Sequence, residues 1–197
     1  MRTISFSENL RAKVSQDLDK GPVVPGYKAN LPRLLEKLNQ ALATELVCVL
    51  RYRRHYEMAK GVHSESVAEE FLEHANEEQE HANQLARRIA QLNGEPNFNP
   101  EGLLERSHTQ YRECSSLAEM VRENLIAERI AVEKYSELIR EIGNDDPTTR
   151  KLVESILEKE EEHADDLAKI YSSYSAQDHS TNPTAHAGPG IGLAGEL

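Results

Sequence analysis

The stretch Glu78-Gln79-Glu80-His81 decides the fold, because its Glu and His occupy helix positions that should be apolar. A second such stretch, Glu160-Glu161-Glu162-His163, stands near the C-terminus. In each stretch the Glu and the His are three residues apart, so on a helix both side chains lie on one face. That face is otherwise apolar in both segments, which makes the pattern specific.

Alternating steps of four and three residues define a helix-packing seam in each of four segments. The expected helices are Asn30 to Gly61, about Ser64 to Asn93, Ser116 to Gly143, and Asp146 to about residue 172. Each seam is apolar except near its middle, where ionisable residues occupy seam positions. These residues are Glu45 in the first segment, Glu78 and His81 in the second, Glu128 in the third, and Glu160 and His163 in the fourth.

The ends of these segments carry ordinary helix signals. Asn30 is a good N-cap with Pro32 in the first turn, and Ser116 with Glu119 forms a capping box. The link from Asn93 to Cys114 is the only long one between helices. A parallel crossover needs such a length, whereas a hairpin needs only a few residues. The sequence therefore predicts an all-α four-helix bundle with a long crossover between the second and third helices.

The two halves of the chain look like copies of one helical hairpin. Glu45 and Glu78 are 33 residues apart, and Glu128 and Glu160 are 32 apart. A tyrosine follows the first Glu of each half by seven residues, at positions 52 and 135. Packing two such hairpins together brings all the polar seam groups to one level of the core.

Length, net charge, hydropathy and cysteine count limit the class of protein to which this chain can belong. With 197 residues and 22.2 kDa the chain is long enough for one domain, which we place at residues 30–172 between an N-terminal extension (1–29) and a flexible C-terminal tail (173–197). The net charge of -11 argues against holding DNA by phosphate neutralisation. No apolar run approaches membrane-spanning length, and the polar N-terminus predicts no signal peptide. Two cysteines form no disulfide framework, so we expect a cytoplasmic protein.

Burial of the seam carboxylates needs compensation. Each buried carboxylate costs several kcal/mol unless it is paired, and the seams hold no Lys or Arg. Two divalent cations would balance four carboxylates, with neutral imidazoles completing the ligand set. Carboxylates with two His suit iron or manganese, and the lack of Cys in the set argues against zinc or copper. The pattern matches the ligand set of di-metal carboxylate bundles.

Four motifs carry a family resemblance: Leu42-Ala43-Thr44-Glu45-Leu46, Glu78-Gln79-Glu80-His81, Ala127-Glu128 and Glu160-Glu161-Glu162-His163. With them the chain resembles the bacterioferritins and the Dps-like proteins that share their di-iron centre, over about residues 30–172. The resemblance implies a ferritin-like four-helix bundle that stores and detoxifies iron. It also implies ferroxidase activity, in which Fe(II) is oxidised to Fe(III) at an intrasubunit di-iron centre and mineral is deposited in an oligomeric cage.

The resemblance assigns roles to residues of this chain. The residues expected to hold two iron ions per subunit are Glu45, Glu78, His81, Glu128, Glu160 and His163. Glu78 and Glu128 match the family's bridging carboxylates. Tyr52 matches a tyrosine kept beside the centre as hydrogen-bond partner and candidate electron donor, and is expected to join these six as a catalytic residue. Glu73 and Glu77 fall where bacterioferritins place inner-surface iron ligands.

Departures from the family pattern narrow the expectations. Bacterioferritins ligate haem through a Met immediately after the second-helix Glu, and Gln79 stands there, so no haem is expected. The Pro- and Gly-rich tail shows no fifth helix, which leaves a homo-oligomer of 12 subunits as well supported as one of 24. The substrates would be Fe(II) with O2 or hydrogen peroxide. The sequence leaves open the choice of oxidant, and of iron or manganese.

Several residues near the expected ligands are interpreted as structural groups. Cys48, three residues after Glu45, is interpreted as a small core residue in preference to a redox group. His55 and His74 are expected to be surface or supporting groups instead of ligands. The basic turn Arg51-Tyr52-Arg53-Arg54 is expected to pair with acids on a neighbouring helix or subunit.

Other functions and partners stay open at this stage. A Dps-like DNA-protecting protein would use residues 1–37 as a basic arm, although the acidic total makes nucleic acid an unexpected partner. A di-iron or di-manganese oxygenase or catalase would need substrate-pocket elements that so short a chain lacks. The segment Gly190–Leu197 loosely resembles the docking peptides of cargo loaded into encapsulin shells, without their common Ser-Leu pair.

Overall fold

The computed structural model describes residues 6–59 and 64–180, with side chains as far as Tyr174. Four long helices form the body of this part of the chain: α2 (Leu31–Met58), α3 (Ser64–Gln91), α5 (Leu117–Ile142) and α6 (Pro147–Ser180). The short helical elements are α1 (Phe6–Val14), η1 (Leu18–Lys20) and α4 (Leu103–Arg106). The described residues contain no strand, so the all-α prediction is confirmed.

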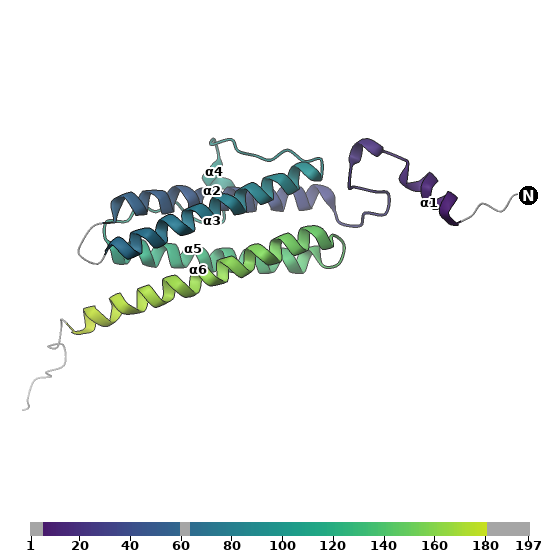
Figure 1. The fold of residues 1–197 in the computed structure, drawn as a ribbon. Coiled ribbons are helices and arrows are strands. Elements are labelled where there is room, and N and C mark those ends of the chain that lie inside the picture. Colours follow the sequence, from purple (N-terminus) through teal and green to yellow (C-terminus); the bar gives the residue numbers. More distant parts are fainter. Residues whose placement is uncertain (1–5, 60–63, 181–197) are drawn as a thin grey trace, which may run out of the picture.

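The four long helices pack as two antiparallel hairpins (Figure 1). In one hairpin α2 packs on α3, and in the other α5 packs on α6. The helices α3 and α5 run parallel to each other, because the link between them returns along the bundle and carries α4 against α2 (Figure 1). The four-helix bundle with a long crossover between its second and third helices is therefore confirmed.

The helix starts follow the expected capping chemistry. The Asn30 side-chain oxygen accepts a hydrogen bond from the Arg33 backbone N–H at 3.3 Å. The capping box of Ser116 and Glu119 is complete in both directions. Asp146 caps α6 by accepting from the Thr149 backbone N–H at 2.9 Å. These bonds satisfy donors that each helix leaves unpaired at its N-terminus.

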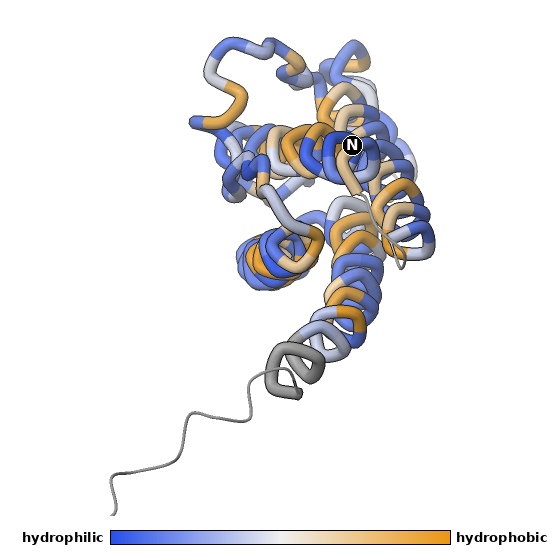
Figure 2. The backbone as a smooth tube through the Cα atoms, turned by 90° about the vertical axis from the view of Figure 1, so that its left-hand side faces the viewer, coloured by the Kyte–Doolittle hydropathy of each residue, from blue (hydrophilic) through white to orange (hydrophobic). Residues whose placement is uncertain are grey.

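Two apolar clusters fill the bundle above and below a polar level. Hydrophilic and hydrophobic residues are interspersed in the helices, with no long hydrophobic run in view (Figure 2). One cluster includes Leu38, Leu42, Leu85, Ile89 and Ile156. The other includes Cys48, Tyr52, Phe71, Val121 and Leu167. On each helix the polar seam residues fall between these two clusters, so packed apolar layers enclose them from both ends.

The N-terminal extension is partly attached to the bundle. The Tyr27 hydroxyl donates to Asp146 at 2.7 Å, and the Asn93 amide donates to the Lys20 carbonyl at 2.8 Å. The same Asp146 carboxylate accepts two hydrogen bonds from Arg88, each 3.0 Å long. The last residues of the extension therefore close one end of the bundle, while α1 projects beyond it (Figure 1).

The last helix runs past residue 172, where the sequence suggested that order ends. It continues to Ser180, because Ala and Gln are good helix formers, Ser and Asp cost only tenths of a kcal/mol each, and the first strong breaker is Pro183. The segment Gly190–Leu197, which loosely resembles the docking peptides of encapsulin cargo, lies outside the described residues. So does most of the tail predicted to be flexible.

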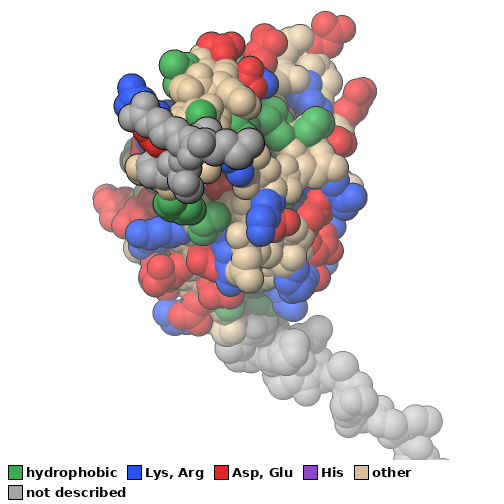
Figure 3. Space-filling view, turned by 90° about the vertical axis from the view of Figure 1, so that its right-hand side faces the viewer, with side chains coloured by type: hydrophobic (Ala, Val, Ile, Leu, Met, Phe, Trp, Pro, Cys, Tyr) green, Lys and Arg blue, Asp and Glu red, His purple; other side chains and the backbone are tan. Residues whose placement is uncertain are grey.

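The surface carries charges of both signs. On the end of the molecule that carries α1, Asp and Glu side chains are interspersed with Lys and Arg (Figure 3). Over the described part of the chain, every helix is too short or too polar to cross a lipid bilayer.

Candidate metal centre

The six ionisable seam residues meet in the middle of the bundle. All are buried, with exposed fractions of 0 to 5 %: Glu45, Glu78, His81, Glu128, Glu160 and His163. Their ligand atoms form two overlapping groups, within each of which the atoms lie no more than 4.8 Å apart. The first group is Glu45, Glu78, His81 and Glu160, and the second is Glu78, Glu128, Glu160 and His163. Each long helix thus supplies one carboxylate, and α3 and α6 each add an imidazole.

The carboxylates shared by the two groups are Glu78 and Glu160. The family resemblance implied Glu78 and Glu128 as the bridging pair, whereas the carboxylates common to these two groups are Glu78 and Glu160. Glu128 belongs only to the second group, and one of its oxygens is held by the Tyr52 hydroxyl. Glu160 instead reaches His81, with 2.9 Å between the carboxylate oxygen and Nδ1. The two Glu-x-x-His motifs therefore supply the shared carboxylates, one from each hairpin.

Both imidazoles turn Nδ1 toward the carboxylates. His81 Nδ1 lies 3.4 Å from oxygens of Glu45 and of Glu78. His163 Nδ1 lies 3.5 Å from Glu78, while its Nε2 lies 2.6 Å from the Glu77 carboxylate. A carboxylate on the outer nitrogen fixes the ring orientation and raises the basicity of the inner one. Glu77, interpreted from sequence as an inner-surface group, thus orients His163.

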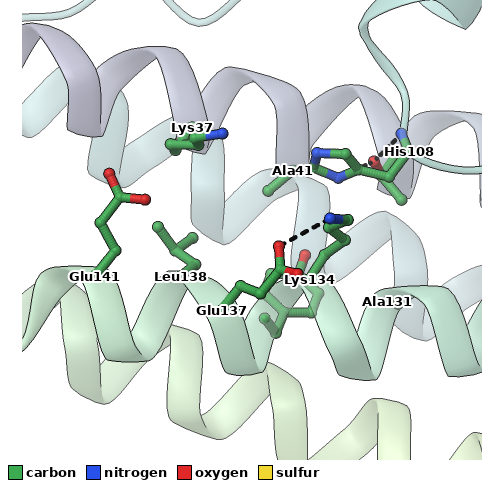
Figure 4. A pocket seen from close by; sticks show the side chains of 10 residues that line it. Lys37, Ala41, His108, Ala131, Lys134, Glu137, Leu138 and Glu141 are labelled. Atoms are coloured by element: carbon green, nitrogen blue, oxygen red, sulfur yellow. Dashed lines mark hydrogen bonds and ion pairs between the residues drawn. The ribbon is translucent and has the colours of Figure 1, made fainter.

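Two tyrosines close the polar level. Tyr52 of α2 donates to Glu128 of α5, and Tyr135 of α5 donates to Glu45 of α2. Tyr135 also lines a cavity of about 60 Å³ between α2 and α5, whose wall includes Lys37 and Lys134 (Figure 4). The sequence repeat revealed both tyrosines, but only Tyr52 was assigned a role.

Negative charge at the site is poorly compensated. Burial raises the pKa of Glu45, Glu128 and Glu160, and repulsion by the Glu78 carboxylate raises it further. Burial opposes the charged form of His163, but the carboxylates around it outweigh this and raise its pKa to about 9. In the absence of a cation, these carboxyl groups therefore keep their protons to a higher pH than ordinary carboxyls, and His163 keeps its proton at neutral pH.

The unpaired atoms show what the site lacks. Within the described residues, eight buried side-chain N or O atoms have no hydrogen-bond partner, and seven of them belong to this site. They are Glu45 Oε2, both oxygens of Glu78, His81 Nδ1, Glu128 Oε2, Glu160 Oε1 and His163 Nδ1. Orphaned buried polar atoms are rare and costly. These seven lie within the two groups, so the donor set fits a pair of oxygen- and nitrogen-preferring divalent cations such as Fe²⁺ or Mn²⁺.

Two expectations about neighbouring residues are met only in part. His74 and His55 are buried, with exposed fractions of 2 % and 0 %, so of the two roles expected for them, surface group or supporting group, the first is excluded. Arg51 is also buried and does not pair with an acid: it donates to the Asn124 side chain at 2.7 Å and to the Gln110 carbonyl at 3.1 Å. Gln110 lies in the crossover, which a helical seam cannot place. Cys48 is buried, as expected for a core residue.

Comparisons with known proteins agree with the fold and the carboxylate–histidine set. The family model of the ferritin-like domain matches residues 35–174, and the chain belongs to this family. Two curated relatives are a bacterioferritin of Brucella melitensis and the nutrient stress-induced DNA-binding protein of a Synechococcus strain. The first is 31% identical over 138 residues, which cover 69% of this chain and 81% of the relative. The second is 30% identical over 151 residues, which cover 75% and 86%.

A solved structure is similar over most of the bundle. It is the dodecameric thioferritin of Bacteroides fragilis, described as bacterioferritin-related, and it matches with a TM-score of 0.74 and 30% identity. The match covers 78% of this chain and 92% of that one. The chain is thus a ferritin-like helical bundle with relatives among both bacterioferritins and Dps-like proteins.

Proposed function

We propose that the protein is an iron storage and detoxification protein with ferroxidase activity. The observation that carries this proposal is the set of seven unpaired N and O atoms enclosed in the bundle. A pair of Fe²⁺ ions, bound as substrate, would satisfy these atoms and neutralise the carboxylates. The family to which the chain belongs supports the choice of iron.

The geometry favours one distribution of ligands. Glu45 and His81 would hold the first ion, Glu128 and His163 would hold the second, and Glu78 and Glu160, which belong to both groups, would serve both ions. Two metals bridged at about 3.5–4 Å can act together on one oxidant molecule. Anionic oxygen ligands stabilise Fe³⁺ more than Fe²⁺, which favours oxidation. The two Fe²⁺ ions supply two electrons, the number that reduces O2 to hydrogen peroxide or hydrogen peroxide to water.

The surrounding residues support this chemistry without binding the ions. Tyr52 and Tyr135 each hold one oxygen of a terminal carboxylate, so that the other oxygen faces the ions. Tyr52 is also a candidate electron donor, because its hydroxyl directly contacts the ligand Glu128. We further propose a cytoplasmic cage of identical subunits, of 12 as in the thioferritin or of 24, in which the ferric product is deposited.

Stopped-flow oxidation of Fe²⁺ tests the proposal. The whole protein, given two Fe²⁺ per subunit and then O2 or hydrogen peroxide, is expected to form Fe³⁺ in a fast phase. Glu78→Ala or Glu128→Ala removes a ligand and is expected to slow this phase by roughly 100-fold or more. Glu161→Gln, an exposed neighbour of Glu160, is the matched control and is expected to keep the wild-type rate. Wild-type rates in both Ala variants would contradict the proposal.

DNA protection is a second candidate, favoured by the name of the Synechococcus relative. The net charge of -11 and the mixed charges near α1 count against it. A gel-shift assay at low salt separates the two functions, because retardation that disappears on removing residues 1–29 would support DNA binding by the extension.

A further inference from the structure

A second cluster of metal-ligating side chains lies between α3 and α6, beside the candidate centre. Glu70 and His74 stand one turn apart on α3, and Asp166 stands on α6. One ligand atom of each lies within 4.8 Å of the others. We propose that Glu70, His74 and Asp166 bind a third divalent cation in each subunit, outside the dinuclear centre.

The buried imidazole distinguishes this cluster from an ordinary group of surface acids. The Tyr52 hydroxyl has one proton and donates it to Glu128, so toward His74 it can only accept. His74 Nδ1, 3.2 Å from that hydroxyl, therefore carries the ring proton. In the neutral ring Nε2 is then a bare lone pair. It faces a Glu70 oxygen at 3.2 Å, so two acceptors meet at a site where His74 is 2 % exposed.

A cation bound between these two acceptors would remove their mutual repulsion. Divalent first-row metals such as Fe²⁺, Mn²⁺, Co²⁺ and Zn²⁺ bind imidazole nitrogen and carboxylate oxygen together. Asp166 supplies the second carboxylate, and Glu73 and Glu77 add negative charge near Glu70. Among the described residues, no Lys or Arg forms an ion pair with Glu70. Asp166 has an ion pair with Lys169 at 2.9 Å, but both side chains are largely exposed, so this pair is weak.

The cluster lies between solvent and the dinuclear centre. The side chains of Glu70 and Asp166 are 29% and 45% exposed, so a hydrated ion can reach them. On the inner side, the His74 ring stacks on His163 with 4.0 Å between ring centroids. One imidazole thus separates the proposed cation from a ligand of the dinuclear centre. If the proposed function holds, the cluster is a waiting position for Fe²⁺ on its way to that centre.

Anomalous diffraction from crystals of the whole protein saturated with Zn²⁺ tests the site without any turnover. The wild type is expected to show three zinc peaks per subunit, two among the six ligands and one between Glu70, His74 Nε2 and Asp166. The double variant Glu70→Gln/Asp166→Asn is expected to lose only the third peak. Its matched control is Glu69→Gln/Asp165→Asn, which removes two exposed carboxylates of the same helices and is expected to keep all three. Zinc content measured in solution is expected to fall by one ion per subunit in the first variant alone.

Each outcome has a distinct meaning. Two dinuclear peaks without a third in the wild type would overturn the inference and leave the proposed function standing. A third peak that persists in Glu70→Gln/Asp166→Asn would also overturn it. A third peak without the dinuclear pair would support the accessory site and contradict the proposed function.

Discussion

Tyr135 of α5 donates a hydrogen bond to Glu45 of α2, and Tyr52 of α2 donates the reciprocal bond to Glu128 of α5. Each hairpin therefore holds a carboxylate of the other. The seven-residue spacing between Glu and Tyr in both halves places each tyrosine two turns from its own Glu and beside its partner's. The two copies of the hairpin complete one another's site.

Removal of either tyrosine hydroxyl is expected to weaken metal binding. Tyr135→Phe and Tyr52→Phe keep the apolar packing but leave an oxygen of Glu45 or Glu128 without its donor. Loss of such an outer hydrogen bond typically lowers metal affinity by about 10- to 100-fold. Titration with Co²⁺ under anaerobic conditions measures the affinity. Tyr111→Phe, in the crossover, is the control and is expected to bind as the wild type does. Unchanged affinity in both site variants would show that the hydroxyls do not position the carboxylates.

Glu77 is expected to act through His163. Glu77→Leu removes the acceptor at Nε2, frees the ring to rotate, and is expected to lower affinity at the second metal position by roughly 10-fold or more. Glu77→Gln retains an acceptor oxygen and is expected to recover most of this loss. Equal losses in the two variants would indicate that the charge of Glu77, and not its hydrogen bond, matters.

Cation binding is expected to release protons. Burial is the main cause of the raised pKa values of Glu45, Glu128 and Glu160, and the surrounding carboxylates raise the pKa of His163 to about 9, so His163 holds a proton at neutral pH in the metal-free protein. Ligands must lose their protons to bind metal, and apparent affinity should therefore rise from pH 6 to pH 8. Anaerobic Fe²⁺ addition in a pH-stat measures the release directly. A pH-independent affinity without released protons would contradict this description of the site.

The Arg88–Asp146 pair is expected to be the main ionic contribution to stability outside the metal centre. The two side chains are 9% and 3% exposed, so Asp146→Ala leaves a buried guanidinium uncompensated and should cost about 3–5 kcal/mol in unfolding free energy. Urea denaturation measures the loss. Asp145→Ala, at an exposed neighbour, should change stability by less than about 0.5 kcal/mol.

The same pair predicts a pH dependence. Burial opposes ionisation of Asp146, but hydrogen bonds from Thr149, Tyr27 and Arg88 outweigh it and lower the pKa below the ordinary 3.8. A lowered folded-state pKa stabilises the protein fully above the unfolded value, and this contribution is lost as the pH falls through the folded value. The stability difference between wild type and Asp146→Ala should therefore be constant above about pH 5 and shrink below pH 3.8. A difference that persists in acid would mean that the carboxylate's charge is not involved.

The sequence could predict the polar level because its spacing is strict on α3 and α6. Glu78 and His81 lie on a continuous seam from Val67 to Leu92, and the seam residues of α3 are buried as expected. The seam predicted for α2 steps from Leu31 to Leu35 to Leu38 and is less accurate at its start, where Leu34 is buried while Leu31 and Leu35 are only half-buried. A heptad pattern drifts by about 20° per seven residues on a straight helix, so the register loses accuracy away from its anchor.

Other features depend on groups that helical spacing does not place. The sharing of Glu160 depends on which way a long side chain turns within the core. Arg51 is buried because the crossover brings the Gln110 carbonyl to it. The position of His74 between Tyr52 and Glu70 gives it a role that its seam position alone did not suggest.

Mössbauer spectroscopy shows directly whether two iron ions share one site in the bundle. The protein is loaded anaerobically with two ⁵⁷Fe²⁺ per subunit and then exposed to oxidant. An antiferromagnetically coupled pair of Fe³⁺ ions is expected in the wild type, and the loss of this pair is expected in Glu78→Ala. Spectra showing only isolated high-spin Fe³⁺ in the wild type would contradict the claim that these carboxylates and imidazoles hold two ions together.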